Sequence, residues 1–387
     1  MYNRSMDSLV EPKKPGLAAD HDEIDTLLLS AASTVIAVDS IRYLREDSPM
    51  PAPFRRGPRL EIRGKLLLPS AEAFAKLSER FRSLGHIAIL RKVGDDDVVL
   101  AVPYDASATA SKPWLAIALF VATVLSVLWV GSTGEEATGS LFDIFRGWPF
   151  AASMLSILLA HEFGHYLVSR YFGTPVTLPY FIPLPISLFG TMGAIIRMKG
   201  PPRDRRALLA IAVAGPLAGL AMAIPILVIG LRLSVVESTA YLPPGTILQE
   251  GNSLLYAALK FVLFGRFLPS GNEDVMLHPV AMAGWVGLLV TGLNLIPAAQ
   301  LDGGHIVYAL LGERARWLTW SVVVILLLLG LVWQGWLLWA ALVLVFGRAQ
   351  VMLLDSITTL RRGERGLALL MLVIFVLVFV PVPMVLR

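Results

Sequence analysis

The sequence predicts a polytopic α-helical membrane protein with a small soluble α+β domain ahead of its membrane part. Hydrophobic residues make up 56% of the 387 residues and charged residues only 16%. The mean hydropathy of +0.67 lies outside the usual range of soluble proteins. Segments with the length and apolar character of a membrane span, about 17 to 25 residues, begin at Trp114 and are missing from residues 1–112. The chain therefore divides near Lys112.

The excess positive charge belongs to the membrane part. Residues 1–112 hold 16 basic and 16 acidic residues, whereas the remainder holds 17 and 13. Basic residues in short loops between apolar segments determine membrane orientation. The pI of about 9.3 is therefore no indication of nucleic-acid binding, and none is expected. Cysteine is absent, so a metal ion would depend on histidine, aspartate or glutamate.

Residues 1–20 are expected to form a disordered tail, and residues 21–112 a small α+β domain. DEIDTLLLSAAST predicts a helix or the approach to a strand, and IAVDSIRYL follows it. LEIRGKLLL predicts a strand, and HIAILRKV and VVLAVPY predict a hairpin around the turn GDDD. SAEAFAKLSERFRSLG predicts a helix with Ser70 as its cap and Gly85 at its end. These elements suggest a ferredoxin-like domain. It contains no candidate catalytic cluster, so packing or partner contact is its expected role.

Residues 113–387 are expected to form six to seven transmembrane helices. The predicted spans are residues 114–131, 149–172, 207–231, 277–297, 317–332, 336–348 and 366–384. The fifth and sixth could be one long tilted helix, but WQGW at 333–336 favours two, because glycine and interfacial tryptophans suit a turn at the membrane surface. Residues 252–268 are apolar but interrupted by Lys260, Gly265 and Arg266, which predicts an interfacial or re-entrant helix.

Charged loops predict the orientation. Residues 197–206, RMKGPPRDRR, carry five basic residues and one acidic residue, whereas residues 132–148 carry one basic residue and three acidic ones. The first loop should therefore be cytoplasmic and the second external. RRGER at 361–365 falls on the cytoplasmic side of the same scheme, as does the N-terminal domain. The expected location is the lipid bilayer of a prokaryotic plasma membrane.

The stretch LLAHEFGHYL, residues 158–167, places three polar side chains inside an apolar segment. His161 and His165 are four residues apart, so they share one helix face and can bind one cation. Glu162 beside them is placed to handle the proton of a metal-bound water. A charge at mid-bilayer costs about 2.5 to 3.5 kcal/mol, which makes a functional role the default. The alternative is that the three side chains only satisfy one another within the helix bundle.

A zinc site with two histidines needs a third protein ligand and an open position for water. The candidate is Asp302, which ends an apolar segment in GLNLIPAAQLDGGHIVYALLG; the glycines beside it allow close approach to another helix. Its alternative role is to cap a helix that begins near Gly303. His305 suits a partner that orients a ligand better than a fourth ligand, because a fourth ligand would close the site.

HEFGH in one apolar segment and NLIPAAQLDGGH in a later one, with GPLAG at 215–219 between them, resemble the site-2 protease family of intramembrane zinc metalloproteases. The resemblance is strongest over residues 149–312, the expected catalytic core. It implies one zinc ion per chain and a family assignment of site residues. The implied ligands are His161, His165 and Asp302, and the implied catalytic acid/base is Glu162. No PDZ-like insertion is visible between 231 and 277, so the chain is similar to the compact members without one.

The resemblance also implies the substrates. These are membrane-anchored proteins that the family cuts within a transmembrane helix, usually after an earlier protease has removed the outer part. Asn294 is the candidate donor for the oxyanion of the reaction, and its alternative role is an interhelical hydrogen bond. Gly215 and Gly219 fit the small-xxx-small rule, and helix packing alone explains them. The sequence does not define the oligomeric state.

The segment 174–200 contains four prolines and cannot be a normal spanning helix. It is expected to enter the membrane as a re-entrant, hairpin-like loop. ISLFGTMGAIIRM within it, with Gly190 and Gly193, could offer a strand edge that holds an unwound substrate. The alternative is a hairpin that only plugs the bundle.

Two other functions compete with an intramembrane peptidase. An ion-binding transporter would use the same buried histidines and carboxylates, but such proteins usually carry internal repeats, which this sequence lacks. A catalytically silent membrane scaffold would not need Glu162, both histidines and Asp302 together.

Overall fold

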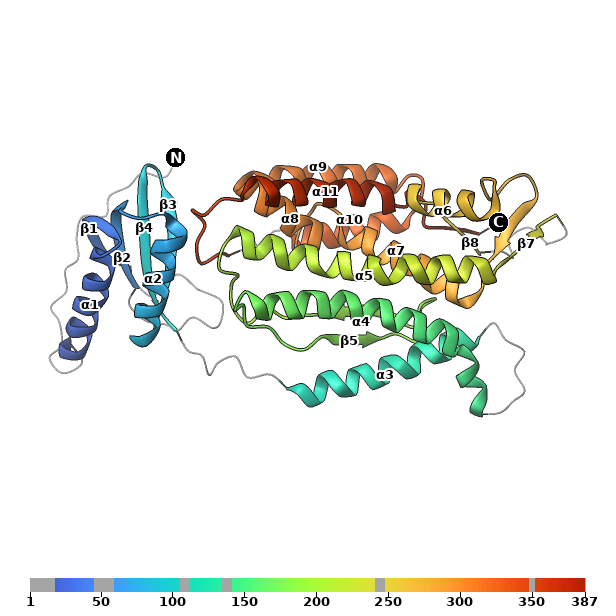
Figure 1. Cartoon of the computed structure of the whole chain (residues 1–387), viewed down its shortest axis with the longest axis horizontal. Coiled ribbons are helices and arrows are strands. Elements are labelled where there is room, and N and C mark those ends of the chain that lie inside the picture. Colours follow the sequence, from blue (N-terminus) through green and yellow to red (C-terminus); the bar gives the residue numbers. More distant parts are fainter. Residues whose placement is uncertain are drawn as a thin grey trace. The chain divides into compact units, whose positions relative to one another are not determined.

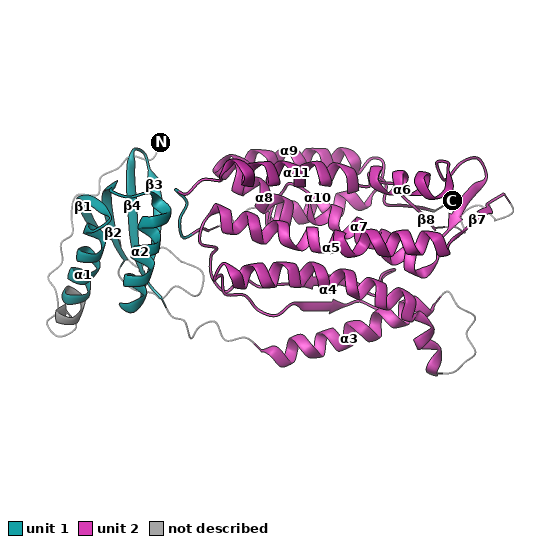
Figure 2. Cartoon of the chain, viewed as in Figure 1, with its two compact units in different colours: residues 1–109, 354–357 teal, residues 110–353, 358–387 magenta. Residues whose placement is uncertain are grey.

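The computed structural model describes residues 18–44, 59–104, 112–133, 141–240, 248–347 and 352–386. Residues 1–17 of the expected N-terminal tail lie outside the described residues. The chain forms two compact units (Figure 2). One comprises residues 1–109 with 354–357, and the other residues 110–353 with 358–387.

The N-terminal unit is an α+β fold. Its elements are α1 (Ala18–Ser33), β1 (Ile36–Leu44), β2 (Arg59–Leu66), α2 (Ser70–Ser83), β3 (His86–Val93) and β4 (Asp96–Pro103). The antiparallel sheet has the strand order β1-β2-β4-β3. The helical period of α2 buries Phe74, Leu77 and Phe81 against Ile62 and Val99 of the sheet. The strands, the helix and the hairpin predicted for this region are thus present.

The strand order and the start of α2 test two predictions for this unit. Strand β4 lies between β2 and β3, so β2, α2, β3 and β4 form a split β-α-β arrangement. Among the described residues no strand precedes α1, so a second such arrangement is not complete there. The described residues therefore contain part of the suggested ferredoxin-like topology. The predicted Ser70 cap is wrong, because Pro69 occupies the N-cap and Ser70 is already the first residue of α2.

A short segment from far along the chain completes the sheet. The amide of Leu90 in β3 donates to the carbonyl of Leu354 at 2.7 Å, and the amide of Ser356 donates to the carbonyl of Leu90 at 3.1 Å. Leu90 and Asp355 form a parallel bridge. Edge pairing satisfies backbone groups that a bare edge would leave to solvent. Residues 354–357 therefore belong to the N-terminal unit although the sequence separates them from it.

The other unit is mostly helical (Figure 1). Its helices are α3 (Pro113–Ser132), η2 (Leu141–Gly147), α4 (Trp148–Tyr171), α5 (Arg205–Leu233), α6 (Leu254–Phe264), α7 (Pro279–Asn294), α8 (Asp302–Leu311), η3 (Gly312–Arg314), α9 (Ala315–Leu329), α10 (Gly335–Phe346) and α11 (Arg362–Val378). Its short strands are β5 (Tyr180–Pro183), β6 (Thr191–Ile195), β7 (Val235–Ser238), β8 (Leu248–Glu250), β9 (Glu273–Met276) and β10 (Met384–Leu386). Helices α4, α5 and α7 pack on one another around the largest apolar core, and α3 packs on α4 and β5.

Three helical stretches in the described part of the chain are long and apolar enough to cross a membrane: α3, Phe142–Tyr171 with α4, and α5. The other predicted spans are also helical but shorter; α7 has 16 residues and α10 has 12. Helix α9 ends before α10 begins, so the alternative of one long helix is wrong. Trp336 of the predicted turn is fully buried and donates through Nε1 to the carbonyl of Pro381 at 2.6 Å.

Helix α6 corrects the interpretation of Lys260. From the sequence, this lysine was interpreted as an interruption of an apolar segment, which predicted an interfacial or re-entrant helix. In the structure its side chain is fully buried, with Nζ 3.5 Å from Glu250 Oε1 and 4.4 Å from the centre of the Tyr256 ring. The helix ends instead at Gly265, whose left-handed backbone (φ 72°) suits a residue without Cβ. Lys260 is therefore part of the core and not of a membrane-facing surface.

Candidate metal centre

Helix α4 presents two histidines one turn apart. His161 and His165 project from the same face because four residues make about one turn of an α-helix. The backbone of α5 approaches this part of α4 closely, since a Cβ on Gly164 would lie 2.6 Å from the carbonyl oxygen of Ala214. The two imidazoles therefore lie at a tight crossing of α4 and α5, with His161 only 5% exposed.

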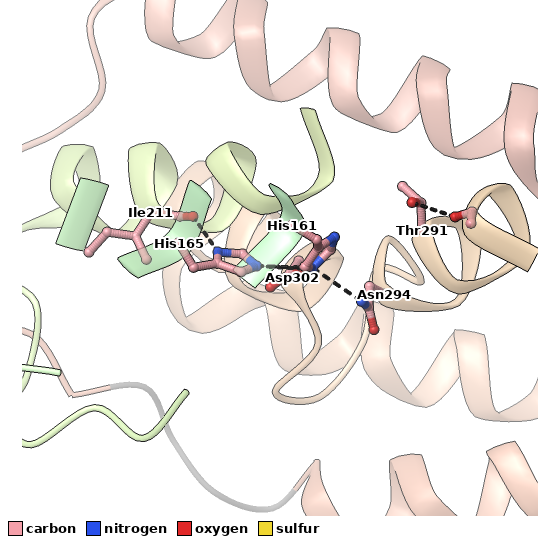
Figure 3. A network of polar contacts seen from close by, with 7 residues as sticks. His161, His165, Ile211, Thr291, Asn294 and Asp302 are labelled. Carbon is pink, nitrogen blue, oxygen red and sulfur yellow. Dashed lines mark hydrogen bonds and ion pairs between the residues drawn. The ribbon is translucent and has the colours of Figure 1, made fainter. Parts of the chain in front are cut away.

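Asp302 meets these histidines from a distant part of the sequence. It is the first residue of α8, after the turn that follows α7. Its Oδ2 lies 3.2 Å from His165 Nε2 and 3.4 Å from His161 Nε2, and the two Nε2 atoms are 3.2 Å apart (Figure 3). Among the described residues, these three side chains are the group whose ligand atoms converge closely enough for a metal ion.

The triangle of ligand atoms fits zinc. Tetrahedral bonds of about 2.0 to 2.1 Å place neighbouring ligand atoms roughly 3.3 to 3.4 Å apart. The observed separations of 3.2, 3.2 and 3.4 Å match this value. Two imidazole nitrogens and one carboxylate oxygen are ligands that zinc accepts, and three ligands leave the fourth vertex open for water or substrate. His305 lines the same cavity without joining the converging group.

The far nitrogen of His165 is held by α5. His165 Nδ1 lies 2.8 Å from the carbonyl oxygen of Ile211 (Figure 3). A carbonyl oxygen only accepts, so Nδ1 carries the proton and Nε2 keeps its lone pair for the centre of the triangle. Such an outer hydrogen bond is the usual device that orients a metal-binding imidazole.

The turn before α8 explains the glycines after Asp302. A Cβ on Gly303 would lie 2.1 Å from the carbonyl oxygen of Leu295, and one on Gly304 would lie 2.3 Å from that of Ala299. The close approach predicted there is thus made to the preceding turn and not to another helix. Leu301 occupies the N-cap of α8, so the alternative role of Asp302 as a helix cap is wrong.

Asn294, the last residue of α7, adds an amide to the site. Its Nδ2 lies 3.3 Å from His161 Nε2 (Figure 3). A nitrogen whose lone pair binds a cation cannot also accept a hydrogen bond. With a metal bound, the Asn294 amide is therefore free to donate to another acceptor in the cavity.

A cavity of about 290 Å³ surrounds the three candidate ligands. Its wall includes Glu162, which is 7% exposed, together with Asn294 and residues 194–196 at the end of β6. Two polar residues of this wall, Ser169 and Gln300, were not predicted from the sequence. Both carried a usable signal: Ser169 follows His165 by one helical turn, and Gln300 is a polar residue in an apolar segment two positions before Asp302.

Residues 149–332 match the model of peptidase family M50. Over these residues the chain is similar to peptidase family M50. This is the site-2 protease family that HEFGH and NLIPAAQLDGGH resemble, and the matched range includes every residue of the candidate site.

Several similar curated proteins are named as chloroplastic zinc metalloproteases. The chain is 29% identical to "Probable zinc metalloprotease EGY2, chloroplastic" of Arabidopsis thaliana over 83% of this chain and 59% of the relative. It is 35% identical to "Probable zinc metalloprotease EGY1, chloroplastic" of the same plant over 43% of this chain and 30% of the relative. The chain thus spans at most about three fifths of the length of these relatives. No solved structure matches the chain significantly.

Proposed function

We propose that this chain is an intramembrane zinc endopeptidase of family M50 that hydrolyses peptide bonds within transmembrane segments of membrane-anchored proteins. The single observation that carries the proposal is the triangle of His161, His165 and Asp302. Its edges have the lengths of a zinc tetrahedron, and it opens into a cavity shared with Glu162 and Asn294. The names of the relatives support zinc as the metal.

Zinc held by this triad would supply a Lewis acid and make water nucleophilic at neutral pH. The chain supplies the proton transfer. The Glu162 carboxylate takes a proton from the attacking water as its oxygen bonds to the scissile carbonyl carbon, and delivers that proton to the amide nitrogen as the carbon–nitrogen bond breaks. Burial of Glu162 keeps bulk water from competing for this proton. The Asn294 amide donates a hydrogen bond to the oxyanion that forms at the carbonyl.

The β5–β6 hairpin is the proposed substrate platform. The two strands pair antiparallel in a two-stranded sheet, so β6 has a second edge for an extended backbone. The hairpin is fixed on the side of α3, where Phe120 contacts Phe181 and the Ser126 hydroxyl donates to the carbonyl of Gly190 at 2.5 Å. The end of β6 lines the cavity. A substrate helix unwound along β6 would therefore present its carbonyls beside Glu162. The alternative, a hairpin that only plugs the bundle, predicts no effect of strand-edge substitutions on the affinity for substrate.

The remaining parts of the proposal concern topology and partners. Six to seven spans would be formed if the shorter helices α7, α9, α10 and α11 also cross the bilayer, some with the help of their flanking loops. The basic loops at 197–206 and 361–365 then lie on the cytoplasmic side of a prokaryotic plasma membrane, together with the N-terminal unit. The partners are single-pass or membrane-anchored proteins cut in a sequence of regulated proteolytic steps.

The test uses purified full-length protein reconstituted with a single-pass helical substrate. Glu162→Gln should keep about one zinc ion per chain and abolish cleavage, because it removes the proton carrier and leaves the three ligands in place. Glu313→Gln changes an exposed glutamate of η3 and serves as the matched control, which should cleave like the wild type. Cleavage that persists in Glu162→Gln would exclude the mechanism. Wild-type protein that transports a solute without cleaving would favour a transporter, and one that binds zinc but neither transports nor cleaves would favour a silent scaffold.

A further inference from the structure

The glycines of GPLAG contact the candidate ligands themselves. A Cβ built on Gly215 would lie 2.1 Å from Nε2 of His165, 2.4 Å from its Cδ2 and 2.5 Å from its Cε1. All three are atoms of the imidazole edge that faces the metal site. One turn earlier on α5, the carbonyl of Ile211 accepts the hydrogen bond of Nδ1. The ring of His165 therefore lies along α5. Its Nδ1 is hydrogen-bonded to the carbonyl of Ile211, and its Nε2 end packs against the backbone of Gly215.

Gly219, the next turn of α5, bears the same relation to His161 at longer range. A Cβ there would lie 3.1 Å from Nδ1 and 3.3 Å from Cβ of His161. These distances are tight but could be relieved by shifts of a few tenths of an ångström. The contacts are thus graded, severe at Gly215 and mild at Gly219.

A third glycine of α5 shows what packing alone looks like. A Cβ on Gly230 would lie 2.1 Å from the backbone nitrogen of Ala281 and 2.4 Å from its Cα, both in α7. The predicted clash is as severe as that at Gly215, but it involves the backbone of a neighbouring helix and no residue of the site. Helix α5 therefore carries a packing glycine and two glycines that face imidazoles, so packing alone does not explain GPLAG.

We propose that Gly215, assisted by Gly219, is a positioning residue for the metal site: it provides the seat on α5 that fixes the distance of the His165 ring from His161 and Asp302. The inference rests on the proposed zinc function and deepens it. Nonbonded contacts of a Cβ essentially never fall below 3.0 Å, so a methyl group at position 215 would push the ring away by close to 1 Å. Binding constellations tolerate displacements of only about 0.5 Å. A single methyl group at this position should therefore spoil the triangle without removing any ligand.

The experiment compares zinc affinity and stability in Gly215→Ala, Gly219→Ala and Gly230→Ala. The full-length variants are purified in detergent, the zinc Kd is measured by competition with a chelator, and the Tm is measured without metal. Gly215→Ala should weaken zinc binding by about 10- to 100-fold, the usual effect of disturbing a residue that orients a ligand. Gly219→Ala should give a smaller loss. Gly230→Ala should lower the Tm and leave the Kd within about twofold of the wild type.

The outcomes separate this inference from the proposed function. If Gly215→Ala binds zinc as tightly as the wild type, Gly215 does not position the His165 ring and the inference is wrong. If Gly215→Ala does not fold, Gly219→Ala decides. A zinc Kd equal to that of Gly230→Ala overturns the inference, and a larger zinc Kd supports it. If Gly230→Ala loses as much affinity as Gly215→Ala, the effect is general packing and the inference also fails. Wild-type protein that binds no zinc would instead refute the proposed function.

Discussion

Two apolar helices of the membrane part, α4 and α6, both bury polar or charged side chains, and their surroundings differ. On α4, His161 and His165 meet Asp302 with three ligand atoms pointing at one centre beside a cavity. On α6, Lys260 lies against Glu250 and the ring of Tyr256, whose hydroxyl also donates to Glu250 at 2.9 Å. In the α4 cluster, the ligand atoms of three side chains point at one centre, as metal binding requires. In the α6 cluster, a lysine is paired with a glutamate. Of these two clusters, only the one on α4 has ligand atoms that converge closely enough to hold a metal ion.

The largest expected effect is loss of the metal. Asp302→Ala removes the only carboxylate of the triangle, so two imidazoles remain and zinc is held too weakly to survive purification. The zinc content measured by metal analysis should fall from about one ion per chain to nearly none, and cleavage should be lost with it. Lys260→Met should keep its zinc, because Lys260 lies in the other cluster. Equal loss of zinc in both variants would contradict the distinction between the two helices.

The second prediction concerns stability. Lys260→Met leaves the buried Glu250 without its cation, and breaking a buried pair in this way costs about 3 to 5 kcal/mol. The Tm in detergent should fall accordingly, and the double variant Lys260→Met with Glu250→Gln should recover part of the loss because no lone charge remains. If the double variant is as unstable as the single one, the pair does not act as a unit.

The same variant should depend on pH. Burial raises the pKa of Glu250, the neighbouring Lys260 opposes that rise, and Asp274 adds to it. Without Lys260 the pKa should rise further, so the folded state favours the neutral carboxyl. A group whose pKa is raised by folding contributes its stability at low pH and loses it as the pH rises through the folded pKa. The Tm deficit of Lys260→Met should therefore be smaller at pH 5 than at pH 8. A deficit independent of pH would place the loss in packing.

A smaller effect is expected from Asn294. Replacement of one oxyanion donor typically lowers kcat by about 100- to 1,000-fold. Asn294→Ala should show this loss while keeping zinc, because Asn294 is not one of the three ligands. An unchanged kcat with a lowered Tm would favour the alternative of a purely interhelical hydrogen bond.

The smallest effect is expected in the N-terminal unit. Ser356→Pro removes the amide that donates to the Leu90 carbonyl, a net loss of about 1 kcal/mol with water available to replace the bond. Hydrogen exchange of the β3 amides should become faster. Ser356→Ala keeps the amide and removes only the hydroxyl, so it should exchange more nearly like the wild type. Slow exchange in Ser356→Pro would show that residues 354–357 do not pair with β3.

Local pattern predicted much of the fold. Short stretches of the sequence show the helical period of the apolar residues in α2 and the alternation of apolar and polar residues in β2, β3 and β4. The four-residue spacing of His161 and His165 is visible in the same way. Features that depend on contacts formed only on folding were wrong or not predicted. Lys260 was interpreted as an interruption of an apolar segment, because its contacts with Glu250 and the ring of Tyr256 form only on folding. Residues 354–357 gave no sign that they would pair with β3.

The candidate site divides in the same way. The spacing of HEFGH places two imidazoles on one helix face, but no local pattern relates them to Asp302, 137 residues beyond His165. The need for a third zinc ligand and the resemblance to a family suggested that pairing, and the structure brings the atoms together. Gly215 was interpreted as packing because a small residue in an apolar helix carries no information about which side chain will rest on it.

The most direct test of the central claim is the position of zinc in a crystal of Glu162→Gln, found from anomalous scattering at the zinc edge. We expect one peak per chain, about 2.0 to 2.2 Å from Nε2 of His161, Nε2 of His165 and a carboxylate oxygen of Asp302. A crystal that contains zinc but shows no peak among these three atoms, or shows it at other side chains, would contradict the account.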